Sequence, residues 1–276
     1  MGPVNEMREL HYSELAAWMR CKRKWWNRHR ERLVSTSTSE ELTLGSLWHL
    51  LAPVCNLKGL LAACNLWDEL TSQLVTDGEV MLRELLGHYN NWWPRQGITI
   101  LEVETEHRWN IPQVDATVVC TPDALVEWKG NKWIYERKTS SKLETSHLFL
   151  DPQGLTYSMA VPDVMGVLYE FARKAHPNKT KLPLFELIPR RISREAKKVW
   201  GQDVASELSL LFANEKLEQM MSRNFNPINW MGCKCEYEDM CMAQLLGRDG
   251  LDMYRRLGDN EDRLREYPEY HDLVEA

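Results

Sequence analysis

The 276-residue chain is 43% hydrophobic and 27% charged, as expected of a globular protein long enough to bury a core. Its net charge of −6 argues against a polycation that binds nucleic acid through overall charge alone. No apolar run approaches the roughly 20 residues of a membrane span, and the N-terminus has no signal-peptide pattern, so we expect a cytoplasmic protein.

The first predicted helix, from Glu14 to about Leu33, concentrates positive charge. Seven Lys or Arg residues lie between Arg20 and Arg32, interleaved with tryptophans. Basic residues among aromatic ones suit a nucleic-acid backbone and its bases. The alternative is a helix that buries its tryptophans and solvates its cations. The residues predicted to bind nucleic acid are Arg20, Lys22, Arg23, Lys24 and Arg28.

A second predicted helix begins near Glu40 and opens a helical insertion over about residues 50–95. Gly45 and His49 are four residues apart and therefore share one face of this helix. The glycine would let a ligand or another backbone approach, and the histidine one turn later could reach it. The alternative is a histidine that is simply part of the core.

The central stretch reads as a β-hairpin with its turn at Gly130-Asn131. With that turn, Leu125 faces Glu136 and Asp123 faces Lys138. Because side chains alternate along a strand, Asp123, Glu136 and Lys138 fall on one side of the hairpin. Two carboxylates and an ammonium group can hold a divalent cation and position a water beside it. The alternative is an amphipathic hairpin with a solvated charged face.

Three further elements are predicted after the hairpin. A helix from about Pro152 to Ala175 carries Gln153 and Tyr157 four residues apart on one face. A strand follows over Leu182–Pro189, and a long amphipathic helix over Arg194–Met221. Helices before and after a small sheet predict an α/β (α+β) fold.

Three cysteines bunch near the C-terminus as Cys233-Lys-Cys235-x5-Cys241. Three thiolates leave a tetrahedral site one ligand short. Cys21 is the natural fourth, since polar residues flank it, whereas apolar residues flank the cysteines of the helical insertion. Four thiolates fit either an iron–sulfur cluster or zinc.

Together and in this order, the motifs resemble the RecB-type branch of the PD-(D/E)XK nuclease superfamily. The resemblance is to its iron–sulfur members, which include CRISPR-adaptation exonucleases and related phage exonucleases. Those proteins carry Gly-x3-His, an Asp followed by Glu-x-Lys, Gln-x3-Tyr, and one early and three late cysteines that bind a [4Fe–4S] cluster. The matching residues are Gly45, His49, Asp123, Glu136, Lys138, Gln153, Tyr157, Cys21, Cys233, Cys235 and Cys241. The first gap between the late cysteines is one residue here and usually two in the family, which leaves zinc open; Arg137 stands where the family often has an apolar residue.

The resemblance implies a restriction-endonuclease-like core, a small mixed sheet flanked by helices, with an N-terminal helical region and a C-terminal iron–sulfur staple. It implies a single nuclease domain over 1–276, which the cluster between 21 and 233–241 closes and which ends in an acidic tail over 249–276. His49, Asp123, Glu136 and the backbone carbonyl of Arg137 would hold Mg²⁺ or Mn²⁺. Lys138 would be catalytic with Asp123 and Glu136, and Gln153 and Tyr157 would hold the DNA strand or the geometry of the site.

The implied function is a metal-dependent DNA exonuclease that acts on single-stranded or frayed ends in recombination, repair or CRISPR adaptation. A bacterial or archaeal cell, or a phage genome, is the implied source, and a helicase, recombinase or integrase the implied protein partner. No Walker A pattern is present, so no nucleotide cofactor is expected. One alternative is a non-catalytic DNA-end-binding subunit of a helicase–nuclease or integration complex. Another is a zinc-stapled helical protein of unrelated function.

Overall fold

A five-stranded mixed sheet, in the strand order β3-β6-β7-β8-β9, forms the centre of the protein. The computed structural model describes residues 7–36, 40–70, 77–142, 145–217, 221–224, 235–252 and 254–257. The strands are β3 (Ile98–Val103), β6 (Ala124–Trp128), β7 (Asn131–Ser140), β8 (Gly166–Arg173) and β9 (Phe185–Arg191). β7 and β8 run parallel, and the other neighbours are antiparallel. The predicted small mixed sheet is confirmed.

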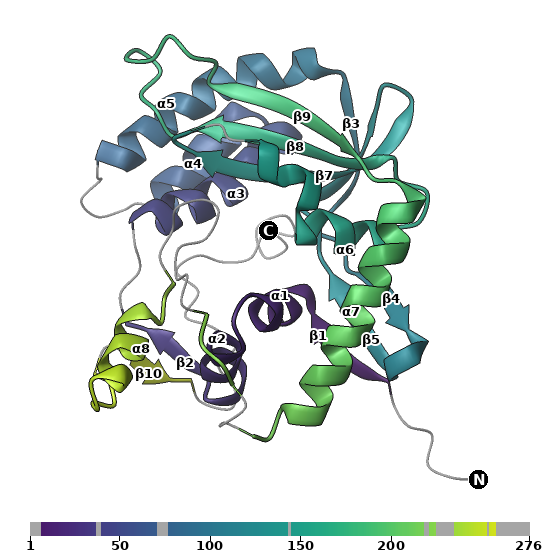
Figure 1. Ribbon diagram of the computed structural model, residues 1–276. Coiled ribbons are helices and arrows are strands. Elements are labelled where there is room, and N and C mark those ends of the chain that lie inside the picture. The colour runs from purple at the N-terminus through teal and green to yellow at the C-terminus, as the bar shows by residue number, and fades with distance from the viewer. Residues whose placement is uncertain are drawn as a thin grey trace.

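Helices cover the two faces of this sheet (Figure 1). One face packs against the helical insertion, in a core that also takes in Ala172 and Phe185 of the sheet. The opposite face contributes Ile134 and Tyr169 to a core that it shares with helices α1 (Tyr12–Arg20), α6 (Pro152–Ala160) and α7 (Arg194–Asn214). The insertion comprises α3 (Glu40–Lys58), α4 (Leu60–Leu70) and α5 (Asp77–Trp92).

Two smaller sheets complete the fold. In the first, β1 (Arg8–His11) pairs parallel with β5 (Ala116–Cys120), and β4 (His107–Ile111) pairs with β5 on its other side. In the second, β2 (Leu33–Ser35) pairs with β10 (Tyr254–Arg256). This second sheet brings the N-terminal region beside α8 (Glu238–Leu245), which follows in the chain after Cys235 (Figure 1).

Short irregular helices link these elements. They are α2 (Lys22–Trp25), a π-helical turn η1 (Trp26–Arg30), and the 3-10 turns η2 (Trp93–Gln96), η3 (Pro112–Val114) and η4 (Ser146–Leu150). Among the described residues, no helix has the length and apolar character needed to cross a membrane.

The hairpin between β6 and β7 turns one residue earlier than its sequence suggests. Lys129 and Gly130 are the two turn residues, with φ values of 51° and 71°, as a type I′ turn requires. Leu125 therefore faces Ile134, not Glu136, and the predicted pairing of Asp123 with Lys138 is wrong. The pairing moves by two residues, so every side chain stays on its predicted side of the sheet.

Three predicted helices also prove shorter. The helix predicted to reach Met221 ends at Asn214. The helix that begins at Pro152 ends at Ala160, and the residues up to 175 include β8, a central strand of the sheet. The N-terminal helix is broken at Cys21, whose extended backbone (φ −163°, ψ 113°) separates α1 from α2.

Candidate active site

The predicted site residues gather where β7 extends beyond the end of β6. β6 begins at Ala124, so Glu136 and Lys138 of β7 have no strand partner on that side. α3 runs close to the same stretch: a Cβ added at Gly45 would stand 3.5 Å from Thr139 Oγ1, an ordinary contact. Helix α3 thus brings His49 to the open end of the hairpin, where Asp123 and Glu136 lie.

Asp123 links the helix to the strand. Its Oδ1 lies 3.3 Å from Nδ1 of His49, and its Oδ2 accepts a hydrogen bond of 2.6 Å from the backbone N–H of Arg137. A residue in a β-ladder directs its N–H and C=O toward the same neighbouring strand. The carbonyl of Arg137 therefore faces the Asp123 side as well.

A chain of hydrogen bonds connects Glu136 to helix α6 on the same face of the sheet. Lys138 Nζ donates to Glu136 Oε2 at 3.1 Å and to Gln153 Oε1 at 2.7 Å. Gln153 Nε2 donates in turn to the hydroxyl of Tyr157 at 3.2 Å. The ring of Tyr157 packs edge-on against Tyr12 of α1, with centroids 5.3 Å apart. The structure thus brings together all of the catalytic residues that the sequence predicts.

Burial and mutual charge set the protonation of these groups. Burial, and then the neighbouring charge of Asp123, raises the pKa of Glu136 to about 7, although Lys138 opposes the shift. Burial also works against the charged form of Asp123, but His49 and the cations on β7 outweigh it and hold the pKa of Asp123 below its ordinary value. For His49, burial is outweighed by Asp123, and the pKa of the imidazole rises.

The donor set suits a divalent cation. Glu136 is 1% exposed, and its Oε1 is buried without a hydrogen-bond partner. A buried carboxylate oxygen left in this way is costly unless a cation or a proton meets it. Within the described parts of the chain, no three His, Cys, Asp or Glu side chains already stand close enough to enclose a metal ion. A cation here would draw Glu136 from Lys138 and Asp123 from His49.

Asp151 is a site residue that the sequence reading missed. It caps α6 by accepting a hydrogen bond of 3.1 Å from the backbone N–H of Gln153, and it accepts another from the hydroxyl of Tyr169. Its charge helps to raise the pKa values of both Glu136 and Lys138. The signal was an Asp directly before Pro152 at the start of a helix, which is a typical N-cap pattern.

Comparison with known proteins identifies the family of this chain. The family model of the PD-(D/E)XK nuclease superfamily matches residues 9–242, which include Asp123, Glu136 and Lys138. The chain belongs to the PD-(D/E)XK nuclease superfamily. No match is found among curated proteins. A solved structure described as "Crystal structure of SSO0001" aligns over 75% of this chain and 78% of its own, with 13% identity and a TM-score of 0.35.

PD-(D/E)XK nucleases use Mg²⁺ or Mn²⁺, and the residue between Glu and Lys of the motif is Arg137 in this chain. Its side chain points to the opposite face of β7, where it is 2% exposed and pairs with Glu170 of β8. The hydroxyls of Tyr89 and Tyr135 donate to the same carboxylate. Arg137 is thus a core residue beneath the nuclease motif.

The cysteines of this nuclease converge in part. Burial raises the pKa of Cys241, Arg223 opposes the shift, and the thiols of Cys21 and Cys235 add to it, so each of these two thiols lies within electrostatic reach of Cys241. These three described cysteines do not stand close enough together to enclose a metal ion. Cys21 Sγ also accepts hydrogen bonds from the backbone N–H groups of Lys24 and Asn224 at 3.4 and 3.3 Å. Cys233 lies outside the described residues.

Carboxylates already engage most of the basic residues of the N-terminal region. Lys24 and Arg28 both pair with Glu236, at 2.9 and 3.1 Å, and Lys22 lies 3.6 Å from Glu207. Arg23 is buried at 8% exposure. These pairs tie α2 and η1 to the C-terminal part of the chain. Nucleic-acid binding by this region stays a prediction, in competition with that structural role.

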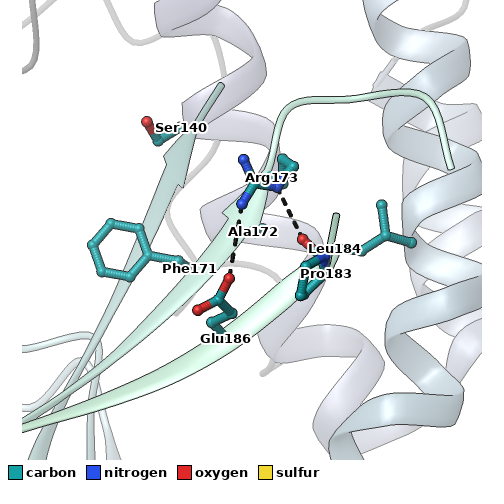
Figure 2. Close-up of a pocket in the computed structure, with 7 residues that line it drawn as sticks. All are labelled: Ser140, Phe171, Ala172, Arg173, Pro183, Leu184 and Glu186. Carbon is teal, nitrogen blue, oxygen red and sulfur yellow. Dashed lines mark hydrogen bonds and ion pairs between the residues drawn. The ribbon is translucent and has the colours of Figure 1, made fainter. Parts of the chain in front are cut away.

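A shallow hollow of about 190 Å³ lies farther along the strands from Lys138 (Figure 2). Ser140, Phe171, Arg173 and Glu186 are among the residues that line it. Arg173 donates to the carbonyl of Pro183 at 2.9 Å and pairs with Glu186 at 3.7 Å. Because the charged groups at this hollow satisfy each other, we do not assign it a ligand.

Proposed function

We propose that the protein is a Mg²⁺- or Mn²⁺-dependent DNA exonuclease that acts on single-stranded or frayed ends, in recombination, repair or CRISPR adaptation. The observation that carries the proposal is the unpaired, buried Oε1 of Glu136, next to Asp123 and one residue removed from Lys138. Glu170 Oε1 is also buried without a hydrogen-bond partner, but it faces Arg137. Glu136 Oε1 instead belongs to a carboxylate beside that of Asp123, where a cation would balance the charge.

In this proposal His49, Asp123, Glu136 and the carbonyl of Arg137 hold the cation. When bound, the cation polarises the scissile phosphate and lowers the pKa of its water. Lys138 orients the attacking water and stabilises the charge that develops on the phosphate oxygens. Gln153 fixes the ammonium group of Lys138 through its 2.7 Å hydrogen bond, and Tyr157 fixes Gln153. Asp151 fixes the start of the helix that carries them both.

We further propose that Cys21, Cys233, Cys235 and Cys241 bind a [4Fe–4S] cluster. The effect of two of these thiols, Cys21 and Cys235, on the pKa of Cys241 supports the proposal. The cluster would join the N-terminal helices to the segment before α8, which the ion pairs of Glu236 also join. Iron and acid-labile sulfide, measured after anaerobic purification, should each approach four per chain. Zinc without sulfide would refute the cluster.

End-labelled linear DNA and circular DNA, each single- and double-stranded, test the nuclease proposal in the presence of Mn²⁺. The wild-type chain should shorten linear single strands and leave circles intact. Lys138→Ala should abolish cleavage and spare binding, because the lost ammonium group acts in the transition state. Lys179→Ala, which removes an exposed lysine from a turn, is the matched control. Cleavage retained by Lys138→Ala would overturn the catalytic assignment, and DNA binding without cleavage by the wild type would favour a non-catalytic end-binding subunit.

A further inference from the structure

Phe149 and Leu150, at the end of η4, form an exposed apolar surface, which we call the apolar step, beside the candidate active site. The two side chains are 70% and 80% exposed. Phe149 is the one aromatic side chain among the exposed large hydrophobic residues of the described chain. The next residue is Asp151, which caps the helix that presents Gln153 to Lys138. Phe149 and Leu150 therefore lie directly before the helix that carries Gln153 and Tyr157.

A shallow hollow opens between the apolar step and the edge of the sheet. Phe149 and Arg190 form its rim, with the guanidinium carbon 4.4 Å from the centroid of the ring. Asp151 and Tyr169 line it as well, and both interact with the catalytic cluster. Glu136, Tyr169 and Ile188 are neighbours across β7, β8 and β9. The strand spacing of about 4.8 Å places β9 about 10 Å from β7, the reach of one or two nucleotides.

Arg190 carries a donor that nothing in the described chain uses. Its Nη2 donates to the carbonyl of Thr145 at 3.3 Å, but its Nε is buried with no hydrogen-bond partner. Because the protein encloses this Nε, an acceptor from outside can reach only the terminal nitrogens of the guanidinium group. Phosphate oxygens and the carbonyl groups of bases are acceptors that arginine binds well.

The chain that leads away from Arg190 is basic, although Lys197 already donates a hydrogen bond to the carbonyl of Ser158. The cations there are Arg190, Arg191, Arg194, Lys197 and Lys198, against the single acid Glu195. In the described parts of the chain, no ion pair engages Arg190, Arg191, Arg194 or Lys198. The N-terminal cations, by contrast, are held by Glu207 and Glu236. A local excess of free positive charge attracts a polyanion even on a protein of net charge −6.

We propose that this step and hollow, which we call the Phe149 site, bind an unpaired nucleotide of a single DNA strand on its way to Glu136 and Lys138. The open face of the Phe149 ring stacks on the base, Leu150 extends the apolar surface, and Arg190 and Arg191 hold the adjacent backbone. Stacking accepts any base because each has a π-face, and it requires that the base be unpaired. The inference deepens the proposed function and rests on it: the site would select single strands or frayed ends.

Binding measurements that need no cleavage test the inference. Full-length protein that carries Lys138→Ala is titrated into a fluorescein-labelled oligothymidylate and, separately, into a blunt hairpin duplex. Adding Phe149→Ala should weaken oligothymidylate binding by about 10-fold and leave duplex binding within about 2-fold, since only unpaired bases can stack. Phe149→Trp should bind the single strand as well as the parent does. Leu61→Ala, which truncates an apolar side chain of 75% exposure on α4, is the matched control.

Salt dependence separates stacking from charge. Arg191→Gln should lower the slope of log K against log salt by about 0.7, because one phosphate contact to a single strand is lost. Phe149→Ala should leave that slope unchanged. Coincident thermal unfolding curves confirm that both variants fold.

Single-strand binding that is unchanged in Phe149→Ala, or that falls equally for strand and duplex, would overturn the Phe149 site. It would leave the nuclease proposal standing. Wild-type protein that never cleaves DNA, yet binds single strands in a Phe149-dependent way, would overturn the nuclease proposal and keep the Phe149 site. The two failures are therefore distinguishable.

Discussion

Arg137 and Glu170 form an ion pair beneath the nuclease motif, with Nε and Oε1 3.9 Å apart and both side chains at most 2% exposed. Arg137 stands between Glu136 and Lys138 in sequence and on the opposite face of β7. The hydroxyl of Tyr89, from the helical insertion, donates to the same carboxylate at 2.6 Å. His49 belongs to that insertion as well. The pair therefore fastens the layer that carries His49 to the strand that carries Glu136 and Lys138.

Breaking this pair from one side should be costly. Arg137→Met leaves the carboxylate of Glu170 buried without its counter-ion, and the free energy of unfolding should fall by about 3 kcal/mol. The double variant Arg137→Met, Glu170→Gln should recover most of that loss, because glutamine still accepts from the tyrosine hydroxyls. Denaturant unfolding of the four proteins of the cycle measures the coupling. Single effects that simply add in the double variant would contradict the prediction.

Stability of the metal-free protein should depend on pH through Glu136. Its pKa is raised from 4.5 to about 7 in the folded state, so the folded protein binds the proton more tightly than the unfolded chain does. The free energy of unfolding should therefore fall as pH rises from about 4.5 to 7, by at most about 3 kcal/mol from this group. Glu136→Gln should flatten the profile over that range. Urea unfolding in the presence of a chelator measures it.

The affinity for a divalent cation should rise as pH rises, whereas the stability of the metal-free protein falls. A cation competes with the proton on Glu136 and also needs a neutral ring nitrogen of His49, whose pKa is raised too. Mn²⁺ should therefore raise the melting temperature more at pH 8 than at pH 6. Asp123→Asn should abolish the Mn²⁺-dependent shift at both values. A shift that is equal at the two pH values would show that Mn²⁺ binds elsewhere.

The sequence predicts that the candidate site residues share one face of the hairpin, and this holds although the predicted turn is wrong. The hairpin turn was placed at Gly130-Asn131, but Lys129 accepts positive φ, and the amide of Asn131 supports the turn by donating to the carbonyl of Lys129 at 3.0 Å. The resulting error in pairing was two residues. Because the side-chain period of a strand is also two, Asp123, Glu136 and Lys138 still lie on one face.

The missed central strand β8 has a different cause. Seven of its eight residues are buried, since helices cover both faces of the sheet. A strand buried on both faces loses the alternation that reveals strands in a sequence, and the apolar run was read as more helix. Pro162 and Gly166 were the available break signals. Glu170 and Tyr169, both on this strand, were missed with it.

The contact between α6 and the sheet depends on Gly154, one residue after Gln153. A Cβ added there would stand 2.7 Å from the hydroxyl of Tyr169 and 2.8 Å from Cγ2 of Val167, closer than real Cβ atoms come. Gly154→Ala should therefore push α6 outward, break the hydrogen bond from Tyr169 to Asp151 and shift Gln153 from Lys138. The loss of stability should be about 1–3 kcal/mol, as for other overpacked cores.

Gly87→Ala is the matched control, because Gly87 also lies within a helix, α5, and a Cβ there would meet nothing within 4 Å. It should raise the free energy of unfolding by about 0.5–1 kcal/mol through helix propensity. Cleavage kinetics add a second measurement: Gly154→Ala should lower kcat more than it raises KM, because the displaced residue orients Lys138. Stabilisation by both substitutions would show that α6 has room to spare, and that Gln153 does not depend on its close packing.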